Sequence, residues 1–191
     1  MTQASRCLRE ANILHFIKSE TAYSIMINLT ISEAMTAADG QLVHCEDPAY
    51  IGDMFIEGIT LDSRKVKPDW LFIADKGERA DGHDYVESAR RSGAAAAVVE
   101  HELDIPIPQI LVENSLRAMQ RIAGYIREKS GVKVIGVVGS VGKTSTRQML
   151  SCVLEQKFSV LSTQGNFNNE YGLPQTFFRL EPHHEIAVVE M

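Results

Sequence analysis

The sequence contains little cysteine and no long hydrophobic run. Its three cysteines, Cys7, Cys45 and Cys152, are scattered without CxxC spacing, so free thiols in a reducing compartment are favoured over disulfides or a metal site. No apolar run approaches the ~20 residues that cross a bilayer, and residues 1–25 lack the layout of a signal peptide. These absences predict a cytoplasmic protein that does not bind membranes.

Positive charge is also scarce, and the formal net charge is −6 at pH 7. Because nucleic-acid-binding proteins normally carry a basic surface, this balance argues against a general nucleic-acid binder. It is compatible with a local basic pocket for a phosphorylated ligand. The apolar fraction of 45% is sufficient for a hydrophobic core, and 191 residues fit one large domain or two small ones.

Short apolar runs alternate with helical patterns from residue 27 onward. Compact runs at 71–74, 94–100 and 110–112 predict strands. A helix is expected after Thr30 or Ser32, either of which suits the N-cap position. Another is expected within 83–93, with Asp84 as a possible N-cap and Gly93 just past its end. Strands alternating with helices indicate an α/β fold with a largely parallel sheet.

Residues 114–129 form an amphipathic pattern and predict a packing helix. Its apolar face comprises Leu116, Met119, Ile122, Ala123 and Ile126. We place a domain boundary just before this helix, at 113/114. The expected division is a leader at 1–25, disordered or not used by the native protein, a first domain at 26–113 and a second at 114–191.

The stretch "KVIGVVGSVGKTSTRQML" (133–150) has the pattern of a strand, a phosphate-binding loop and a helix that starts at Thr144 or Ser145. A helix start presents unpaired N–H groups to an anion, and glycines let the backbone approach phosphate oxygens. Lys143 would reach the terminal phosphates and Thr144 would bind Mg²⁺. Val137 stands where the longer GxxxxGK[ST] pattern has glycine, which leaves the shorter GxxGKT. In this context nucleotide binding is favoured over a plain strand-turn-helix.

Two later segments strengthen this interpretation. "STQGNFNNEYGLP" (162–174) is a polar loop after a strand at 158–162, and such loops at the carboxyl ends of parallel strands bind ligands in α/β sheets. Simple turn chemistry is the alternative. "EIAVVEM" is a strand that ends on Glu190, which is either an acid facing water or a Mg²⁺ ligand opposite the loop hydroxyl. Together with the phosphate loop, the metal interpretation is the stronger one.

The motifs "GSVGKTST", "TQGNFNNEYGLPQT" and "VVEM", in this order, closely resemble the Mur ligases of peptidoglycan synthesis. Upstream, "DSRKVKPDWLFIADKGERADGH" resembles their UDP-binding domain. The resemblance implies a small α/β UDP-binding N-terminal domain followed by the first part of a P-loop-type central ATPase domain with a mainly parallel sheet. The stretch 162–174 contains Asn168, Asn169 and Glu170, and we call it the Asn-Asn-Glu loop. It most resembles the corresponding loop of members that add D-alanyl-D-alanine to UDP-N-acetylmuramoyl-tripeptide. A sister ligase that adds the third amino acid shares the DSR motif (62–64 in this chain) and the DGH motif (81–83) but usually lacks this loop.

The resemblance implies ATP and Mg²⁺ as cofactors, and a reaction in which a substrate carboxylate becomes an acyl phosphate that an amine then displaces. UDP-N-acetylmuramoyl-tripeptide and D-alanyl-D-alanine would be the partners, and the full-length protein a monomer. Lys143 would be the catalytic residue. The implied ATP-binding residues are Gly139, Ser140, Val141, Gly142, Lys143, Thr144 and Ser145. The implied Mg²⁺ ligands are Thr144 and Glu190. The implied substrate-binding residues are Ser63, Arg64, Asn166, Asn168, Asn169 and Glu170.

Structural alternatives remain for the first domain. Ser63 and Arg64 fit a helix cap with a solvated arginine equally well, and a lone histidine such as His83 is usually structural. Two departures from the family pattern also stand out. "KPDWLF" replaces a Pro-Gly-Asp turn, and Val138 replaces a threonine before the loop.

Mur ligases continue through the rest of the central domain and a third domain, which carry a modified lysine, the adenine pocket and the amine-substrate site. The resemblance therefore implies that this chain is an incomplete front portion. A non-catalytic module that binds UDP-muramoyl-peptide or nucleotide is the main alternative. Another type of P-loop NTPase is a weaker one, because the Asn-Asn-Glu loop and the DSR motif argue against it.

Overall fold

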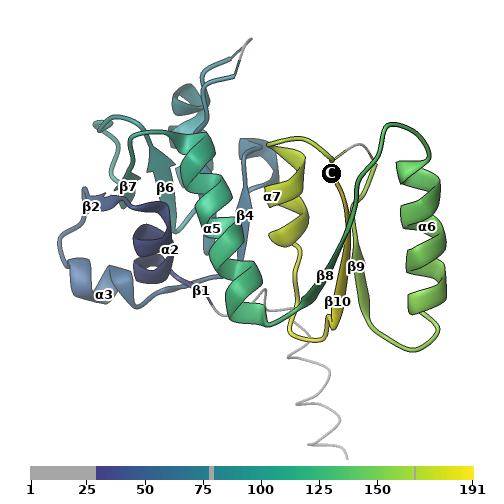
Figure 1. Ribbon diagram of the computed structural model, residues 1–191. Coiled ribbons are helices and arrows are strands. Elements are labelled where there is room, and N and C mark those ends of the chain that lie inside the picture. Colours follow the sequence, from purple (N-terminus) through teal and green to yellow (C-terminus); the bar gives the residue numbers. More distant parts are fainter. Residues whose placement is uncertain (1–28, 78–79, 166) are drawn as a thin grey trace, which may run out of the picture.

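The computed structural model describes residues 29–77, 80–165 and 167–191. The expected leader at 1–25, Cys7 and the predicted substrate-binding residue Asn166 lie outside these ranges. Within them the chain forms two sheets, a five-stranded one and a three-stranded one, with helices between and around them (Figure 1). The mixed α/β character and the mostly parallel strands confirm the predicted fold class.

The five-stranded sheet is formed by the first part of the chain. Its strands, in spatial order, are β2 (Gln41–Val43), β7 (Gln109–Leu111), β6 (Ala96–Val99), β5 (Trp70–Ile73) and β4 (Gly58–Thr60). All neighbours are parallel except β2, which pairs antiparallel with β7. A separate antiparallel pair joins β1 (Leu29–Thr30) to β3 (Phe55–Ile56). Every carboxyl end of β4, β5, β6 and β7 therefore meets the same edge of the sheet.

Helices cover both faces of this sheet, which explains why β5 and β6 are apolar throughout. In β6, Ala96 and Val98 pack into the core beneath α2 (Ile31–Ala38) and α5 (Ser115–Ser130). Ala97 and Val99 point to the opposite face, where α4 (Val86–Arg91) lies. The alternation follows the period of two that a strand imposes on its side chains.

Of the two N-cap candidates in the sequence, Thr30 and Ser32, the structure selects Thr30 for helix α2. The Thr30 hydroxyl accepts a hydrogen bond from the N–H of Glu33, and the Glu33 carboxylate accepts one from the N–H of Thr30. This reciprocal capping box satisfies two N–H groups that the helix start would leave unpaired. The short helix α3 (Pro48–Gly52) follows β2 and is capped by Asp47.

The prediction that Asp84 caps the next helix is wrong. A 3₁₀ turn spans Gly82–Tyr85 and is capped by Asp81, whose carboxylate accepts a hydrogen bond from the N–H of His83. Helix α4 starts only at Val86. The Asp81 cap acts three residues earlier than expected because the chain first makes a 3₁₀ turn, whereas the predicted glycine after the helix, Gly93, does take a positive φ of 95°.

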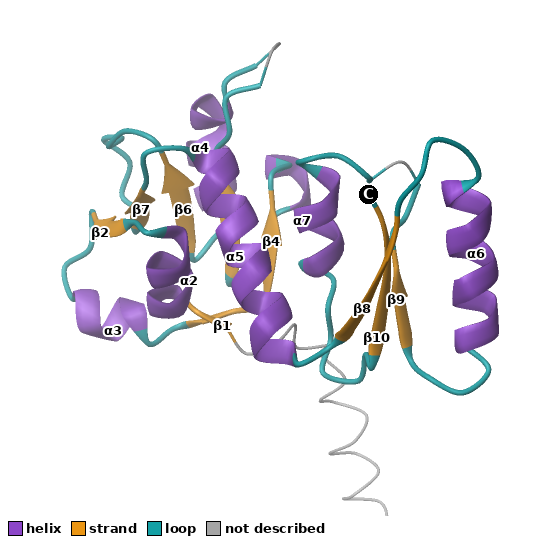
Figure 2. Cartoon of the chain, viewed as in Figure 1, coloured by secondary structure: helices purple, strands orange, loops and turns teal. Residues whose placement is uncertain are grey.

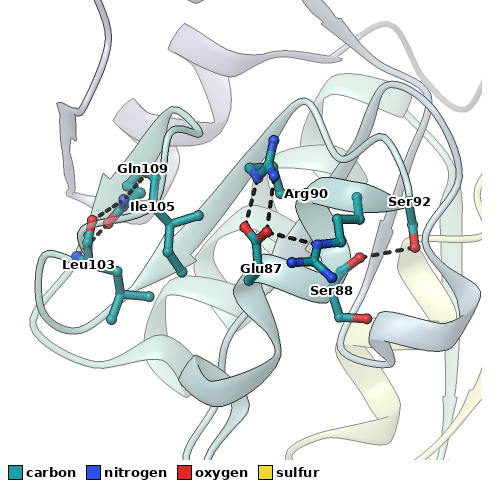
Figure 3. Close-up of polar contacts among 8 residues, drawn as sticks. Glu87, Ser88, Arg90, Ser92, Leu103, Ile105 and Gln109 are labelled. Carbon is teal, nitrogen blue, oxygen red and sulfur yellow. Dashed lines mark hydrogen bonds and ion pairs between the residues drawn. The ribbon is translucent and has the colours of Figure 1, made fainter.

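The surface of α4 carries a compact ion-pair group (Figure 3). The Glu87 carboxylate accepts two hydrogen bonds from the Arg90 guanidinium, at 2.7 and 3.0 Å, and one from Arg91 at 2.8 Å. These contacts lower the pKa of Glu87 from 4.5 to about 2, chiefly through the bonds from Arg90. Both arginines lie in the last turn, where cations also favour the helix dipole.

A buried glutamine explains the break in pattern at 104–109. The fully buried Gln109 amide donates to the carbonyl oxygens of Leu103 and Ile105, at 2.8 and 3.3 Å, and its oxygen accepts from the N–H of Leu103 at 2.9 Å (Figure 3). One side chain thus satisfies the polar backbone of the loop that returns to β7, as a buried polar group requires.

The turn before β5 adopts a conformation that favours glycine. Asp69 has a φ of 63°, at the place where the family pattern has a Pro-Gly-Asp turn. Aspartate tolerates this region better than most residues with a Cβ. The turn is therefore formed, and it is held by hydrogen bonds from the N–H of Asp69 to the carbonyl of Gly93 and from the N–H of Glu57 to the carbonyl of Asp69.

The second sheet has the strand order β8 (Lys133–Val137), β10 (Ile186–Glu190), β9 (Val160–Ser162), and all three strands are parallel. Helix α6 (Lys143–Leu154) lies on the outer face, and α7 (Gly172–Phe177) lies on the face toward the rest of the molecule (Figure 2). The apolar side chains of β10 alternate between these two faces. Val188 packs toward α6, and Ala187 and Val189 pack toward α7.

Helix α5 runs between α2 and α7 and links the two sheets through one continuous core. Its buried apolar residues are Ala118, Met119, Ile122, Ala123 and Ile126. The predicted face is thus largely correct, although Leu116 is only half-buried. Polar contacts add to the packing, because Glu33 accepts hydrogen bonds from the Tyr125 hydroxyl and the Lys129 ammonium. The boundary at 113/114 stays a prediction.

Candidate phosphate-binding site

The loop between β8 and α6 has the backbone geometry of an anion-binding turn. Gly139 has a φ of 151° and Gly142 a φ of 77°, conformations that side chains with a Cβ rarely adopt. Helix α6 begins at Lys143, one or two residues before the predicted start at Thr144 or Ser145, and no described side chain caps it. Its first N–H groups are therefore available to a phosphate.

The loop is open to solvent. Val138 and Val141 are 71% and 93% exposed, and Ser140, Thr144 and Ser145 are exposed as well. Among the described residues, none forms a hydrogen bond or ion pair with the Lys143 ammonium. A cation beside uncapped N–H groups and glycines in open space fits the triphosphate of a nucleotide.

Glu190 lies next to this loop and is buried. The strand register places Glu190 opposite Val137, the last residue of β8, and the residue is only 4% exposed. The alternative of an acid that faces water is therefore wrong. One carboxylate oxygen accepts a hydrogen bond from the Thr144 hydroxyl at 3.0 Å, and the other accepts one from the Asn168 amide at 2.9 Å.

These contacts keep the Glu190 carboxyl ionised. Its pKa is lowered mainly by the hydrogen bond from Asn168, with further contributions from Thr144, Arg147 and Lys143, against an opposing effect of burial. An ionised carboxylate beside a threonine hydroxyl is a donor set that Mg²⁺ accepts when phosphate oxygens complete its coordination. Within the described ranges, no group of three or more His, Cys, Asp or Glu side chains could hold a metal by itself. The residues fit a metal that arrives with the nucleotide.

Arg147 belongs to the site but was missed by the sequence analysis. Its side chain is buried, one guanidinium nitrogen donates to the Ser162 hydroxyl at 2.9 Å, and its Nε lies 3.6 Å from Glu190. This Nε is the one buried side-chain nitrogen or oxygen without a hydrogen bond in the described part of the chain. The available signal was helical spacing, since Arg147 follows Thr144 by three positions and so shares its face.

The Asn-Asn-Glu loop, which directly precedes α7, contacts the site through Asn168. Asn168 contacts Glu190 directly, whereas the Asn169 side chain accepts hydrogen bonds from the N–H groups of Tyr171 and Gly172 and so stabilises the turn itself. The amide of Gln120 on α5 donates to the carbonyl of Glu170 at 3.3 Å. The substrate-binding roles of Asn168, Asn169 and Glu170 stay predictions.

Ser63 and Arg64 lie at the end of β4, apart from the phosphate loop. Ser63 is buried in a 3₁₀ turn (Ser63–Lys65) capped by Asp62. Arg64 is exposed and makes a two-pronged ion pair with Asp62, at 2.8 and 2.9 Å, which lowers the pKa of Asp62 to about 2. Asp62, Ser63, Arg64 and Tyr85 line an open cavity of about 540 Å³. No hydrogen bond or ion pair between described residues joins this cavity to the phosphate loop.

His83 has the structural role that its isolation in the sequence suggested. It is buried, its Nδ1 lies 2.6 Å from the Asp81 carboxylate, and its Nε2 accepts a hydrogen bond from the N–H of Glu100 at 2.9 Å. Both ring nitrogens are engaged, so the imidazole ties the DGH turn to the end of β6.

Two models of known protein families match this chain. Residues 55–138 match the model of the Mur ligase family, catalytic domain, and residues 137–191 match the Mur ligase middle domain. The chain belongs to the Mur ligase family.

Individual relatives and solved structures that resemble this chain carry the name of one ligase within the family. The chain is 37% identical over 166 residues to the UDP-N-acetylmuramoyl-tripeptide–D-alanyl-D-alanine ligase of Escherichia coli (strain K12), covering 87% of this chain and 35% of the relative. A crystal structure of MurF from Acinetobacter baumannii superposes with a TM-score of 0.80 at 33% identity, over 87% of this chain and 36% of that one. MurF ligase from Thermotoga maritima in complex with ADP gives 0.63 at 40% identity, over 70% and 31%.

The chain therefore spans about a third of the length of the relatives it matches. Among the described residues, no helix combines the length and the apolar character needed to cross a membrane.

Proposed function

We propose that this chain carries the nucleotide-binding part of an ATP-dependent ligase that adds D-alanyl-D-alanine to UDP-N-acetylmuramoyl-tripeptide in the cytoplasm. The observation that supports this most is the buried Glu190 carboxylate, held by Thr144 and Asn168 beside the open loop that precedes Lys143. This group joins a phosphate loop to the Asn-Asn-Glu loop at the carboxyl ends of β8 and β10. The identity with ligases named for this reaction supports the same substrates.

The residues have complementary roles in this proposal. Gly139, Ser140, Val141 and Gly142 place backbone N–H groups around the phosphates, and Lys143 and the start of α6 neutralise their charge. Thr144 and Glu190 hold Mg²⁺, which supplies further charge neutralisation when bound. Ser145 continues the first helical turn next to them.

Phosphoryl transfer between two anions depends on alignment and charge neutralisation more than on an acid or base. The substrate carboxylate attacks the γ-phosphorus of ATP, the bond to ADP breaks, and an acyl phosphate forms. The amine of D-alanyl-D-alanine then attacks the acyl carbon, phosphate leaves, and the amine loses a proton. In the proposed site, Lys143 contacts the transferred group, and Asn168, with Asn169 and Glu170, faces the muramoyl-peptide.

The UDP end of the substrate belongs at the other sheet. We assign it to a first domain (26–113), in the cavity lined by Asp62, Ser63, Arg64 and Tyr85. The Asp62 carboxylate holds the Arg64 guanidinium in a fixed orientation, which suits recognition of a diphosphate. The second domain (114–191) then binds ATP.

Isothermal titration of the 191-residue chain tests the proposal. Mg·ATP should bind saturably, and Lys143→Ala should weaken it by roughly tenfold or more, because hydrogen bonds to charged groups contribute about 1.5–3 kcal/mol. Lys157→Ala, which removes a lysine just beyond the other end of α6, should leave the affinity unchanged.

A parallel titration uses UDP-N-acetylmuramoyl-tripeptide. Binding of this ligand without any Mg·ATP signal would favour a module that binds the substrate without turnover. Mg·ATP binding that Lys143→Ala does not change would contradict the phosphate-loop assignment.

A further inference from the structure

A buried arginine lies beside the proposed metal ligand Glu190 and has no role in the proposed function. Arg147, in the second turn of α6, is only 7% exposed. One guanidinium nitrogen donates to the hydroxyl of Ser162, the last residue of β9, at 2.9 Å, and the Ser151 hydroxyl donates to the same oxygen at 3.1 Å. The guanidinium is therefore fixed between α6 and β9, next to the end of β10.

The guanidinium acts on Glu190 through its charge rather than through a hydrogen bond. Its Nε lies 3.6 Å from Glu190 Oε2, beyond the ~3.2 Å limit of an ordinary N–H···O bond. Oε2 accepts instead from Thr144 at 3.0 Å, and Oε1 accepts from Asn168 at 2.9 Å. The Nε is thus buried without a hydrogen bond among the described residues. Because an unbonded buried donor costs free energy, an arginine retained for packing alone would be expected to complete its hydrogen bonds.

The charges around Glu190 favour an anionic complex over a bare cation. The negative charge of its carboxylate faces two cationic side chains of α6, Arg147 and Lys143, and both act on it electrostatically. A bare divalent cation bound to Glu190 would be repelled by both, and the repulsion is strong because Arg147 is buried. A complex of Mg²⁺ with a nucleoside triphosphate has a net negative charge, so the same side chains attract it.

We propose that Arg147 is a positioning residue that keeps the site at Thr144 and Glu190 ready for an anionic metal–nucleotide complex and excludes the bare divalent cation. The buried charge of Arg147 opposes a metal ion that arrives alone, and it attracts one that arrives with phosphates. That this site binds a nucleotide rests on the proposed function, whereas the exclusion of a bare cation can be measured without any nucleotide.

Titration of the nucleotide-free chain with Mn²⁺ tests the exclusion, because Mn²⁺ accepts the same oxygen ligands as Mg²⁺ and the EPR signal of free Mn²⁺ gives the Kd. Arg147→Gln should lower this Kd by roughly tenfold or more, because it removes a like charge a few ångströms from the cation. Arg147→Lys keeps the charge and should keep the Kd of the wild type. The matched control is Arg179→Gln, which removes an exposed arginine that donates to the carbonyl of Ser162 at 3.4 Å and should change the Kd by less than about twofold.

Two further variants separate the effect of charge from a general loosening of the fold. Arg147→Met is a second neutral variant that fills the space of the alkyl stem, and cooperative thermal unfolding shows that each protein is folded. Adding Glu190→Gln to Arg147→Gln should abolish the gain in Mn²⁺ affinity, because the cation then lacks its carboxylate ligand. A Kd for Mn²⁺ that is unchanged in both neutral variants, or a gain that survives Glu190→Gln, would overturn the proposal.

The attraction of the anionic complex is tested by calorimetric titration with Mg·AMP-PNP. Arg147→Gln should raise the Kd of Mg·AMP-PNP by about threefold or more, the opposite direction to its effect on Mn²⁺, whereas Arg147→Lys should leave both values close to those of the wild type. Damage to the fold would weaken both ligands, so a change in the same direction for both would refute the proposal. If the wild-type chain does not bind Mg·AMP-PNP, the proposed function fails for this chain, and the nucleotide-free Mn²⁺ titration still decides whether Arg147 excludes a bare cation.

Discussion

Carboxylates and hydroxyls lie at the carboxyl ends of the parallel strands in both sheets. At the first sheet they bond to one another, whereas at the second they lie beside groups that have no partner in the described part of the chain. At the first sheet, the Ser115 hydroxyl lies 2.7 Å from Asp75 and 2.8 Å from Glu100, and we call these three residues the closed cluster. At the second, Glu190 is bound by Thr144 and Asn168, but Lys143 and the start of α6 lack such partners among the described residues. Polar side chains that bond to one another rigidify a fold, whereas the unpaired N–H groups at a helix start attract an anion. The polar groups at the end of the first sheet therefore stabilise the fold, whereas those at the end of the second sheet are arranged to bind a ligand.

The largest expected effect comes from breaking the core that the two regions share. Ile122 is fully buried on α5, and Ile122→Ala should lower the free energy of unfolding by about 2–5 kcal/mol. Because one core serves both sheets, fluorescence of Trp70, the single tryptophan, and hydrogen exchange in β10 should report the same transition. Val153→Ala, at a 70% exposed position on α6, should change stability by less than about 0.5 kcal/mol. Separate transitions for the two probes would show that the regions unfold independently.

The closed cluster is tested by Ser115→Ala. Removing the buried hydroxyl leaves two half-buried carboxylates without their shared partner, so the free energy of unfolding should fall by about 1–3 kcal/mol in urea titrations. The control is Ser92→Ala, which removes an exposed hydroxyl that donates to the carbonyl of Ser88 (Figure 3). Similar losses in both variants would argue that the cluster has no special role.

The open site is tested by Glu190→Gln. The affinity for ATP should depend on Mg²⁺ in the wild type and lose most of this dependence in the variant, by about tenfold or 1.4 kcal/mol, because a neutral amide is a poor Mg²⁺ ligand. Titrations with ATP in Mg²⁺ and in EDTA measure the ratio of the two affinities. Glu185→Gln, just before the other end of β10, should preserve it. An unchanged ratio in Glu190→Gln would exclude Glu190 as a metal ligand.

The smallest effect concerns the exposed ion pairs of Glu87. Its pKa is lowered from 4.5 to about 2, so the unfolded chain binds the proton more readily in this window. The contribution to stability is therefore fully present above pH 4.5 and is lost as the pH falls toward 2. Glu87→Gln should melt slightly below the wild type at pH 7, and the difference should shrink across this range. A difference that is constant down to pH 2 would contradict the assignment.

Sequence reasoning succeeded where structure depends on neighbours in the chain. The Thr30 cap, the apolar face of α5 and the glycine loop before Lys143 all rest on spacings of a few residues, which helix geometry fixes. It failed at Asp84 because a 3₁₀ turn and an α-helix have similar local signals, and the choice between them depends on what His83 contacts at the end of β6.

What the sequence by itself determined is the α/β class, the phosphate loop and the residue types that a nucleotide site needs. Only the tertiary structure decided which distant residues meet. The register of β10 against β8 brings Glu190 to Thr144, and the packing of α5 between the sheets brings the Gln120 amide to the carbonyl of Glu170. Such contacts arise from strand order and shared burial, and no periodicity along the chain encodes them.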